Sequence, residues 1–344
     1  MSEIEERLAE LKDRGLYRRL RSVSGPQGPR VLLDGRPVLL LCSTTYLGLA
    51  DHPRVREAAA EAAMRYGAGS GASRLVSGNM TIHRRLEEAL AQFKGSESCL
   101  VFGSGYLANT GIVSALAREG DVVFSDALNH ASIVDGCRLS RAETFVYDHC
   151  DMDHLRWGLQ QAEGRGSLIV TDGVFSMDGD VAPLAEIVEL AQRYDARVMV
   201  DDAHGLGALG PGGRGSVAAA GLEAEIDVLV GTLGKSLGSY GAYACCDASL
   251  AKLLINTARS LIFSTALPPP AVAAAMAALE LLREQPRRVE KLQRNAEVLR
   301  EACVAESLQV GGSATQILPL VVGDPGDAVK ASERALERGV FAQA

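Results

Sequence analysis

The stretch IDVLVGTLGKS, residues 226–236, places an apolar run directly before a lysine flanked by glycines, Lys235. An apolar run of this length is typical of a buried strand, and the glycines that follow favour a turn at the strand's carboxyl end. Most lysines are solvated, so a surface charge is the ordinary interpretation of a lone lysine. A lysine beside a buried strand loses hydration, however, and its neutral amine can form a Schiff base with an aldehyde.

A second stretch, VMVDDAH at residues 198–204, also has an apolar run that ends in a polar group, here Asp201 followed by His204. Alone, Asp201 is explained as well by capping of the next turn. Because Lys235 follows the next apolar run, both side chains are expected at the same edge of a parallel sheet. An aspartate there can pair with a protonated pyridine nitrogen while the lysine holds an aldehyde carbon. The pair predicts pyridoxal phosphate (PLP) as the cofactor.

Composition narrows the class of protein. The 344 residues carry a net charge of -8, with 47% hydrophobic and 23% charged residues. This is ordinary for a globular enzyme, and the acidic balance argues against a nucleic-acid partner. No apolar run reaches membrane-spanning length and residues 1–14 carry no signal-peptide block, so we expect a cytoplasmic protein without a membrane partner. The 7 cysteines show no CxxC spacing, which favours reduced thiols and predicts no metal site.

The order of sequence patterns predicts the fold class. From residue 54 onward, helical patterns alternate with short apolar runs. That alternation predicts an α/β domain with a mainly parallel seven-stranded sheet sandwiched by helices. Predicted helices cover 54–66, 82–94, 107–118, 153–163 and 183–194, and predicted strands cover 98–102, 121–125, 143–147, 168–172, 197–201, 226–230 and 242–246.

Three parts are predicted along the chain: an N-terminal arm and hairpin over 1–45, the large domain over 46–268, and a smaller α+β domain over 269–344. Asp-Gly at 34–35, between two apolar runs, is the hairpin signal. The chain ends just after 340–341, where Val-Phe has the pattern of a strand start, and this predicts further C-terminal sequence. Outside the large domain, helices are predicted over 4–11, 271–283, 288–304 and 327–338, and strands over 31–33, 38–42 and 317–322.

A phosphate site is predicted where FGSGYLAN, residues 102–109, passes from a strand through a glycine turn into a helix. Amides at a helix N-terminus bind anions, and Gly105 permits their close approach, with Tyr106 beside it. Hydroxyls that can add to this site belong to Thr232, Ser264 and Thr265.

Two residues are candidates for contact with the cofactor's ring. His130, in NHAS at 129–132, follows a predicted strand, and an imidazole can stack on a flat ring. A polar histidine at a helix start explains His130 equally well. Ser176, in VFSMDG at 174–179, lies on a strand-end loop, where its hydroxyl can bond the ring oxygen or cap a turn.

Two other glycine-rich stretches need different explanations. GLGALG at 205–210 matches a dinucleotide-binding pattern, but PGGRG follows where that pattern requires a helix. Dinucleotide binding is therefore not expected. GAGSGAS at 67–73 follows a helix, and both a substrate loop and a plain linker remain open for it.

With these elements in order, the chain resembles the α-oxoamine synthases, PLP-dependent enzymes of fold type I, over residues 16–344. The resemblance implies decarboxylative condensation of an amino acid with an acyl thioester. DDAHG at 201–205 and FSMDGDVAPL at 175–184 are most similar to the 8-amino-7-oxononanoate synthases of biotin biosynthesis, which implies L-alanine and pimeloyl-CoA or a pimeloyl-carrier protein as substrates. NHASIVDG at 129–136 is shared with the 2-amino-3-ketobutyrate ligases, so a glycine C-acetyltransferase is an alternative. A non-catalytic PLP-binding protein is another.

By this resemblance, Lys235 binds the cofactor covalently, His130 stacks on its ring, and Asp201 pairs with the ring nitrogen. The ring oxygen is expected near His204 and Ser176. The family also implies a homodimer, in which two hydroxyls reach the phosphate of the other subunit. The residues expected to be catalytic are Lys235, His130, Asp201 and His204; those expected at the phosphate are Gly105, Tyr106 and Thr232, with Ser264 and Thr265 from the other subunit.

The residues expected to contact substrate are Arg18, Thr44 and His130. Arg18, in LYRR at 16–19, matches a substrate-contacting position of the family. Most members have Asn-Asn or Asn-Asp before Tyr-Leu-Gly, whereas this chain has Thr44 in TTYLG at 44–48. Threonine offers one hydroxyl in place of an amide, so we expect altered binding of the substrate carboxylate there. The family's Arg-Pro-Pro-Thr segment would fall after Ala344.

Overall fold

The computed structural model describes residues 2–344 and contains a seven-stranded sheet. In spatial order its strands are β4 (Ser98–Phe102), β10 (Ala242–Cys246), β9 (Val228–Thr232), β8 (Arg197–Asp201), β7 (Ser167–Asp172), β5 (Val122–Asp126) and β6 (Glu143–Tyr147). The strands from β9 to β6 pair in parallel, and β10 is antiparallel to both of its neighbours. The prediction of a mainly parallel α/β sheet is confirmed.

Both faces of this sheet are buried, which explains why its strands appear in the sequence as continuous apolar runs. Strand β8 illustrates the arrangement, because residues 198–201 are all buried. Val198 and Val200 pack in one core cluster, and Met199 between them packs in the other. Complete burial of each such side chain stabilises the fold by roughly 1.5–3 kcal/mol.

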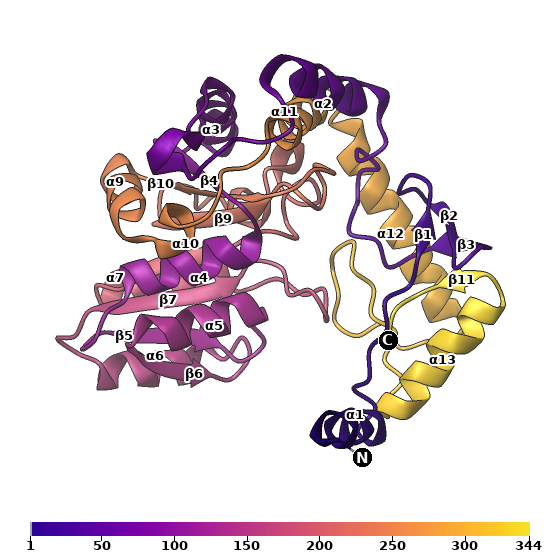
Figure 1. Cartoon of the computed structure of the whole chain (residues 1–344). Coiled ribbons are helices and arrows are strands. Elements are labelled where there is room, and N and C mark those ends of the chain that lie inside the picture. The colour runs from indigo at the N-terminus through magenta and orange to yellow at the C-terminus, as the bar shows by residue number, and fades with distance from the viewer. Residues whose placement is uncertain (1) are drawn as a thin grey trace.

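Helices cover each face of the large sheet (Figure 1). The predicted helices all form, with ends within two residues of the predicted ones. The cluster around Met199 takes side chains from α4 (Gly105–Leu116), α5 (Ala131–Ser140), α9 (Ala248–Thr257) and α10 (Arg259–Ile262). The cluster around Val200 takes them from α2 (Pro53–Tyr66), α3 (Thr81–Lys94), α6 (Met152–Gln161), α7 (Leu184–Arg193), α8 (Ser216–Ala220), α11 (Pro269–Glu284) and α12 (Arg287–Ala305).

A second, four-stranded sheet joins the two ends of the chain. Its strands, in order, are β1 (Val23–Ser24), β2 (Arg30–Leu33), β3 (Arg36–Leu40) and β11 (Val340–Phe341). The turn between β2 and β3 is the predicted Asp-Gly pair, with φ of 49° at Asp34 and 80° at Gly35. Strand β11 pairs in parallel with β3, so residues 340–341 do form a strand. Both terminal parts contribute to this sheet, and the division into three parts stays a prediction.

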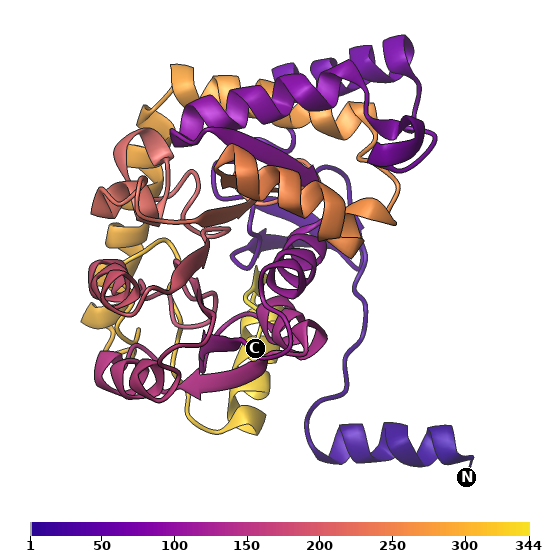
Figure 2. The same cartoon turned by 90° about the vertical axis from the view of Figure 1, so that its left-hand side faces the viewer.

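The remaining segments surround the two sheets. Helix α1 (Glu3–Asp13) buries no residue and extends away from the rest of the chain in Figure 2. Helix α13 (Pro325–Glu337) lies beside the small sheet (Figure 1). The predicted strand over 317–322 is wrong, because Pro319 removes one amide donor and Val321 N–H bonds to Gln309 O at 2.9 Å outside any sheet. Two short turns complete the list, η1 (Arg74–Gly78) and η2 (Pro211–Gly213).

Two expectations from composition bear on the described chain. All seven cysteines are free thiols. Among residues 2–344, no helix combines the length and the apolar character that a membrane span requires.

Candidate active site

Lys235 lies in the turn after β9, close to the loop that follows β8. Its Nζ is 2.6 Å from Nε2 of His204. Burial lowers the pKa of the Lys235 amine, and the carboxylates of Asp201 and Asp172 only partly oppose this effect. A larger share of the amine is therefore neutral than in a solvated lysine, and the neutral amine is the nucleophilic and basic form.

The imidazole of His204 joins Lys235 to Tyr46, a residue that the sequence patterns did not identify. The Tyr46 Oη atom lies 2.6 Å from His204 Nδ1. Burial, with smaller effects from the charges of Lys235 and His130, lowers the pKa of His204 to about 3, so its ring is neutral near neutral pH. Burial raises the pKa of the Tyr46 phenol to about 12. The three side chains form one hydrogen-bonded chain that ends at the Lys235 amine.

Asp201 ends strand β8 and is 6% exposed. Its Oδ1 accepts a hydrogen bond from Ala203 N–H at 3.0 Å, and its Oδ2 accepts one from Asn109 Nδ2 at 2.6 Å. Asn109 comes from α4 and also donates to Ser132 Oγ at 2.9 Å. The carboxylate is thus fixed in position by two donors, one of which, Asn109, the sequence analysis missed.

Asp172, at the end of β7, is paired with Asp201 in the parallel sheet register. Burial raises the pKa of Asp172 well above its usual range, and the Asp201 carboxylate raises it further. The Asp172 carboxyl accepts a hydrogen bond from the His130 amide at 2.7 Å. Asp172 therefore fixes the backbone at His130, which the sequence patterns gave no reason to expect.

His130 is the N-cap residue of α5, and its side chain accepts a bond from the Ser132 amide. The Ser132 hydroxyl lies 2.6 Å from His130 Nδ1. The residue is exposed, and its place at the start of a helix is confirmed, whereas stacking of its imidazole on a cofactor ring stays a prediction.

Two buried amide oxygens beside the site, Asn109 Oδ1 and Gln316 Oε1, have no hydrogen-bond partner among residues 2–344. Gln316 is also new to the site: its Nε2 donates to the backbone oxygen of His204 at 2.8 Å. An unpaired buried acceptor costs about 1–3 kcal/mol. A bound ligand that donates a hydrogen bond is one explanation for such an acceptor.

The N-terminus of α4 provides the predicted anion-binding geometry. Ser104 caps the helix, with its Oγ accepting from Leu107 N–H at 3.2 Å. A Cβ placed on Gly105 would meet nothing within 4 Å, so the space before the first turn is open. The Tyr106 hydroxyl donates to Asp135, at the side of this turn. Thr232 Oγ1 donates to Gly241 O and accepts from Gly234 N–H, both at 3.1 Å.

Some of the predicted site residues make no hydrogen bond with Lys235, His204 or Tyr46. The side chains of Arg18 and Thr44 are exposed and make no hydrogen bond within the described part of the chain. Ser176 is half-buried, in the loop after β7. Ser264 is half-buried and Thr265 is exposed, and Thr265 forms an isolated bridge with Ser73.

The glycine-rich stretch 205–210 is closely packed: Gly205 lies against the buried Asp202, Gly207 against Ser236 and Gly210 against Gly215. A Cβ on Gly205 or on Gly215 would overlap the Asp202 carboxylate. The same carboxylate accepts from the Ser216 amide at 3.0 Å. Close packing thus accounts for these glycines, and the stretch leads into the short turn η2 rather than a helix.

Comparison with known proteins agrees with this arrangement. The family described as aminotransferase class I and II matches residues 36–344. The chain belongs to this family. A family relative from Geobacter sulfurreducens, named 8-amino-7-oxononanoate synthase, is 55% identical over 98% of this chain and 87% of that protein.

Solved structures extend the comparison to the fold. A serine palmitoyltransferase from S. paucimobilis with bound PLP and myriocin has a TM-score of 0.93 at 32% identity, covering 100% of this chain and 90% of that one. The 8-amino-7-oxononanoate synthase from Francisella tularensis has a TM-score of 0.77 at 27% identity, covering 89% and 88%. The family and the fold type predicted from the sequence are therefore confirmed.

Proposed function

We propose that the chain catalyses the reaction for which its Geobacter relative is named, the synthesis of 8-amino-7-oxononanoate. The substrates are L-alanine and a pimeloyl thioester, and the reaction releases carbon dioxide and the free thiol. The observation that carries this proposal is the strand-end pair of Asp201 and Lys235, with the Lys235 amine bonded to His204 at 2.6 Å, in a chain 55% identical to that relative.

The side chains fit PLP in three respects. Lys235 offers an amine whose pKa is lowered by burial, as covalent attachment of an aldehyde requires. Asp201 offers a buried carboxylate, anchored by two donors, for the pyridine nitrogen. The N-terminus of α4 at Gly105 opens onto free space and favours a phosphate, with Thr232 as a further hydroxyl. When bound, PLP supplies an electron sink for the charge that develops at the amino acid's Cα.

Lys235 is assigned the role of general base. Its Nζ takes the Cα proton of the amino acid and later returns a proton to product. Burial lowers the pKa of this amine, which keeps a neutral fraction ready to accept a proton near neutral pH. The Asp201 carboxylate, when paired with the pyridine nitrogen, would favour the electron withdrawal on which the proton transfer depends.

We assign Tyr46 the role of fixing the tautomer of His204. A neutral imidazole has one N–H, and His204 is neutral because its pKa is about 3. The Tyr46 phenol, whose pKa is about 12, keeps its proton and donates it to Nδ1. The imidazole N–H then lies on Nε2, directed at Lys235 Nζ. The imidazole thereby orients the neutral amine by donating a hydrogen bond to it.

The assembly and the substrate contacts remain our proposals. We place Ser264 and Thr265 at the phosphate of a second copy of the chain, as the resemblance to the α-oxoamine synthases implies. Phe263, the preceding residue, is 71% exposed, which suits contact with a partner. Arg18 and Thr44 are proposed to contact substrate, and their exposed side chains are free to do so.

Release of CoA tests the proposal directly. The PLP-loaded protein should release CoA from pimeloyl-CoA in the presence of L-alanine, and the Lys235→Ala variant should not. Faster release from acetyl-CoA with glycine would instead identify a glycine C-acetyltransferase. Cofactor binding without CoA release from either pair would identify a non-catalytic PLP-binding protein. A pimeloyl-carrier protein in place of pimeloyl-CoA distinguishes the two possible acyl donors.

A further inference from the structure

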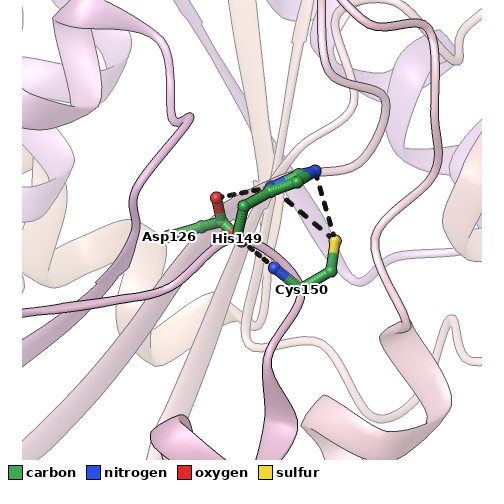
Figure 3. A group of neighbouring side chains, drawn as sticks. All are labelled: Asp126, His149 and Cys150. Atoms are coloured by element: carbon green, nitrogen blue, oxygen red, sulfur yellow. Dashed lines mark hydrogen bonds and ion pairs between the residues drawn. The ribbon is translucent and has the colours of Figure 1, made fainter. Parts of the chain in front are cut away.

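His149 lies between two carboxylates, outside the set of residues assigned above. Its Nδ1 is 2.9 Å from Asp126 Oδ1, and its Nε2 is 2.8 Å from Asp180 Oδ2 (Figure 3 shows the Asp126 side). Ionised carboxylates only accept hydrogen bonds, so His149 makes both bonds at once when both ring nitrogens carry protons, that is, as the imidazolium cation. Burial alone would lower the pKa of His149, but the two carboxylates together hold it above its ordinary value.

Asp126 shapes the turn that leads to His130. It is the last residue of β5 and is 2% exposed. Its Oδ1 accepts from Leu128 N–H at 2.8 Å, and its backbone oxygen accepts from Asn129 N–H at 3.2 Å. The next residue, His130, begins α5. The hydrogen bond from His149 to Asp126 therefore helps to fix residues 126–129, the turn that leads to His130.

Asp180 closes the loop that carries Ser176. Its backbone oxygen accepts from Phe175 N–H at 3.0 Å, and Phe175 O accepts from Gly179 N–H at 2.9 Å. The Phe175 ring is 1% exposed and meets the His149 ring edge-on, with 4.4 Å between centroids. His149 thus contacts both the residue that closes this loop and the residue next to Ser176.

We propose that His149 is a positioning residue: its cation joins the His130 turn to the Ser176 loop and holds these two side chains at a fixed separation. The proposal rests on the function proposed above, because it is that function which places His130 and Ser176 at the same cofactor. Two charge-assisted hydrogen bonds and the Phe175 contact extend to the Ser176 loop the link that the bond from the His130 amide to Asp172 makes at the end of β7.

A metal ion is the alternative occupant of this cluster. Asp126, His149 and Cys150 offer one ligand atom each, all within 4.8 Å of one another. A metal needs a free lone pair on an imidazole nitrogen, whereas both nitrogens of His149 face carboxylates. Burial, and then the charges of Asp126 and Asp180, raise the pKa of the Cys150 thiol to about 12, which disfavours the thiolate form that binds metals. The hydrogen-bonded cation is therefore the better assignment.

The junction is expected to weaken at alkaline pH. The groups that face His149 are the carboxylates of Asp126 and Asp180, the Cys150 thiol and the uncharged Phe175 ring. Because the folded-state pKa of His149 is raised, the contribution of the cation to stability is complete below about pH 6.5 and is lost as the pH rises through the folded-state value.

Hydrogen exchange of residues 174–181 in the full chain without PLP tests the proposal without relying on activity. The His149→Gln variant, which can bond to only one of the two carboxylates, should exchange these amides about tenfold faster than the wild type. The matched control is His154→Gln, because His154 pairs with Asp148 at 3.2 Å and is 30% exposed, against 27% for His149. The control should exchange at the wild-type rate. A second variant, Asp180→Asn, keeps the shape of the loop, removes its charge and should reproduce the faster exchange.

Binding of PLP gives the second measurement. The dissociation constant of PLP should rise about tenfold in His149→Gln and stay unchanged in His154→Gln. After correction for the pH dependence of intrinsic amide exchange, exchange of residues 174–181 in the wild type should accelerate above about pH 6.5. The His149→Gln variant should show no such acceleration. Unchanged exchange in both His149→Gln and Asp180→Asn would overturn the proposal, and slower exchange on adding Zn²⁺ to the wild type would favour the metal instead. If the proposed function itself were wrong, Lys235 would bind no PLP, but the variants would still show the expected changes in hydrogen exchange.

Discussion

Replacement of Tyr46 by phenylalanine tests the assigned proton arrangement with the loss of one atom. The Tyr46 hydroxyl lies 2.6 Å from His204 Nδ1, and the remaining ring keeps its packing in the variant. The hydrogen bond joins two uncharged groups, so its net worth is about 1 kcal/mol, and a buried acceptor left without a donor costs about 1–3 kcal/mol. If this loss falls on the transition state, kcat decreases between about fivefold and 150-fold.

The direction of the pH effect follows from the same contact. Without the phenol, Nδ1 of His204 can carry the imidazole proton, and Nε2 then no longer donates to Lys235. The amine loses a partner that favours its neutral form, so the pKa that controls activity should rise. We therefore expect the acid limb of the kcat profile to shift to higher pH, with KM for alanine changed less than kcat.

Steady-state CoA release across the pH range, together with the absorbance of bound PLP, measures both effects. Tyr194→Phe is the matched control, because Tyr194 accepts one exposed hydrogen bond from Gln160 at 3.2 Å, and this variant should behave as the wild type. A Tyr46→Phe protein with wild-type kcat and an unshifted pH profile would refute the assignment.

Three further predictions follow from other contacts. Asp201→Asn removes the buried charge but keeps the shape of the side chain, so PLP should still bind while CoA release falls by about 100-fold or more. Lys94→Met breaks a buried ion pair with Asp202, in which the two side chains are 1% and 0% exposed, so urea denaturation should show a free energy of unfolding lower by about 3–5 kcal/mol. The control is Arg118→Met, which breaks a pair with Asp121 in which the arginine is 90% exposed, and it should lower the free energy of unfolding by less than about 1 kcal/mol. The pKa of His204 is lowered to about 3 in the folded chain, so between about pH 6.5 and 3 the folded chain binds fewer protons than the unfolded chain. The free energy of unfolding of the wild type should therefore decrease as the pH drops below about 6.5, and it should decrease less in His204→Gln.

The large sheet was predictable because its strands, apart from the partly exposed edge strand β6, are buried on both faces. Runs such as residues 197–201 and 242–246 need apolar side chains at nearly every position, and this signal is local in the sequence. Asp201 and Lys235 could also be predicted to lie close together, because the parallel strands β8 and β9 end at the same edge of the sheet. The run 317–322 carries the same apolar signal but forms no strand, because Pro319 removes one amide donor and the Val321 amide bonds to Gln309 outside any sheet.

The partners of the two predicted residues were not predictable, because they come from distant parts of the chain. Tyr46 lies 158 positions from His204, and Asn109 lies 92 positions from Asp201. Tyr46 and Asn109 are ordinary polar residues in their local sequence, and only the folded arrangement gives them a role. Helix α5 was absent from the predicted helices, although a helix start was one of the two explanations given for His130, which is its N-cap residue.

The central claim is that Lys235 is the residue that carries PLP. Borohydride reduction of the PLP-loaded protein, followed by mass spectrometry of its peptides, tests this claim most directly. We expect the PLP mass on the peptide containing Lys235 and on no peptide of the Lys235→Ala variant. The same mass on a different lysine, such as Lys252 or Lys330, with Lys235 unlabelled, would contradict it.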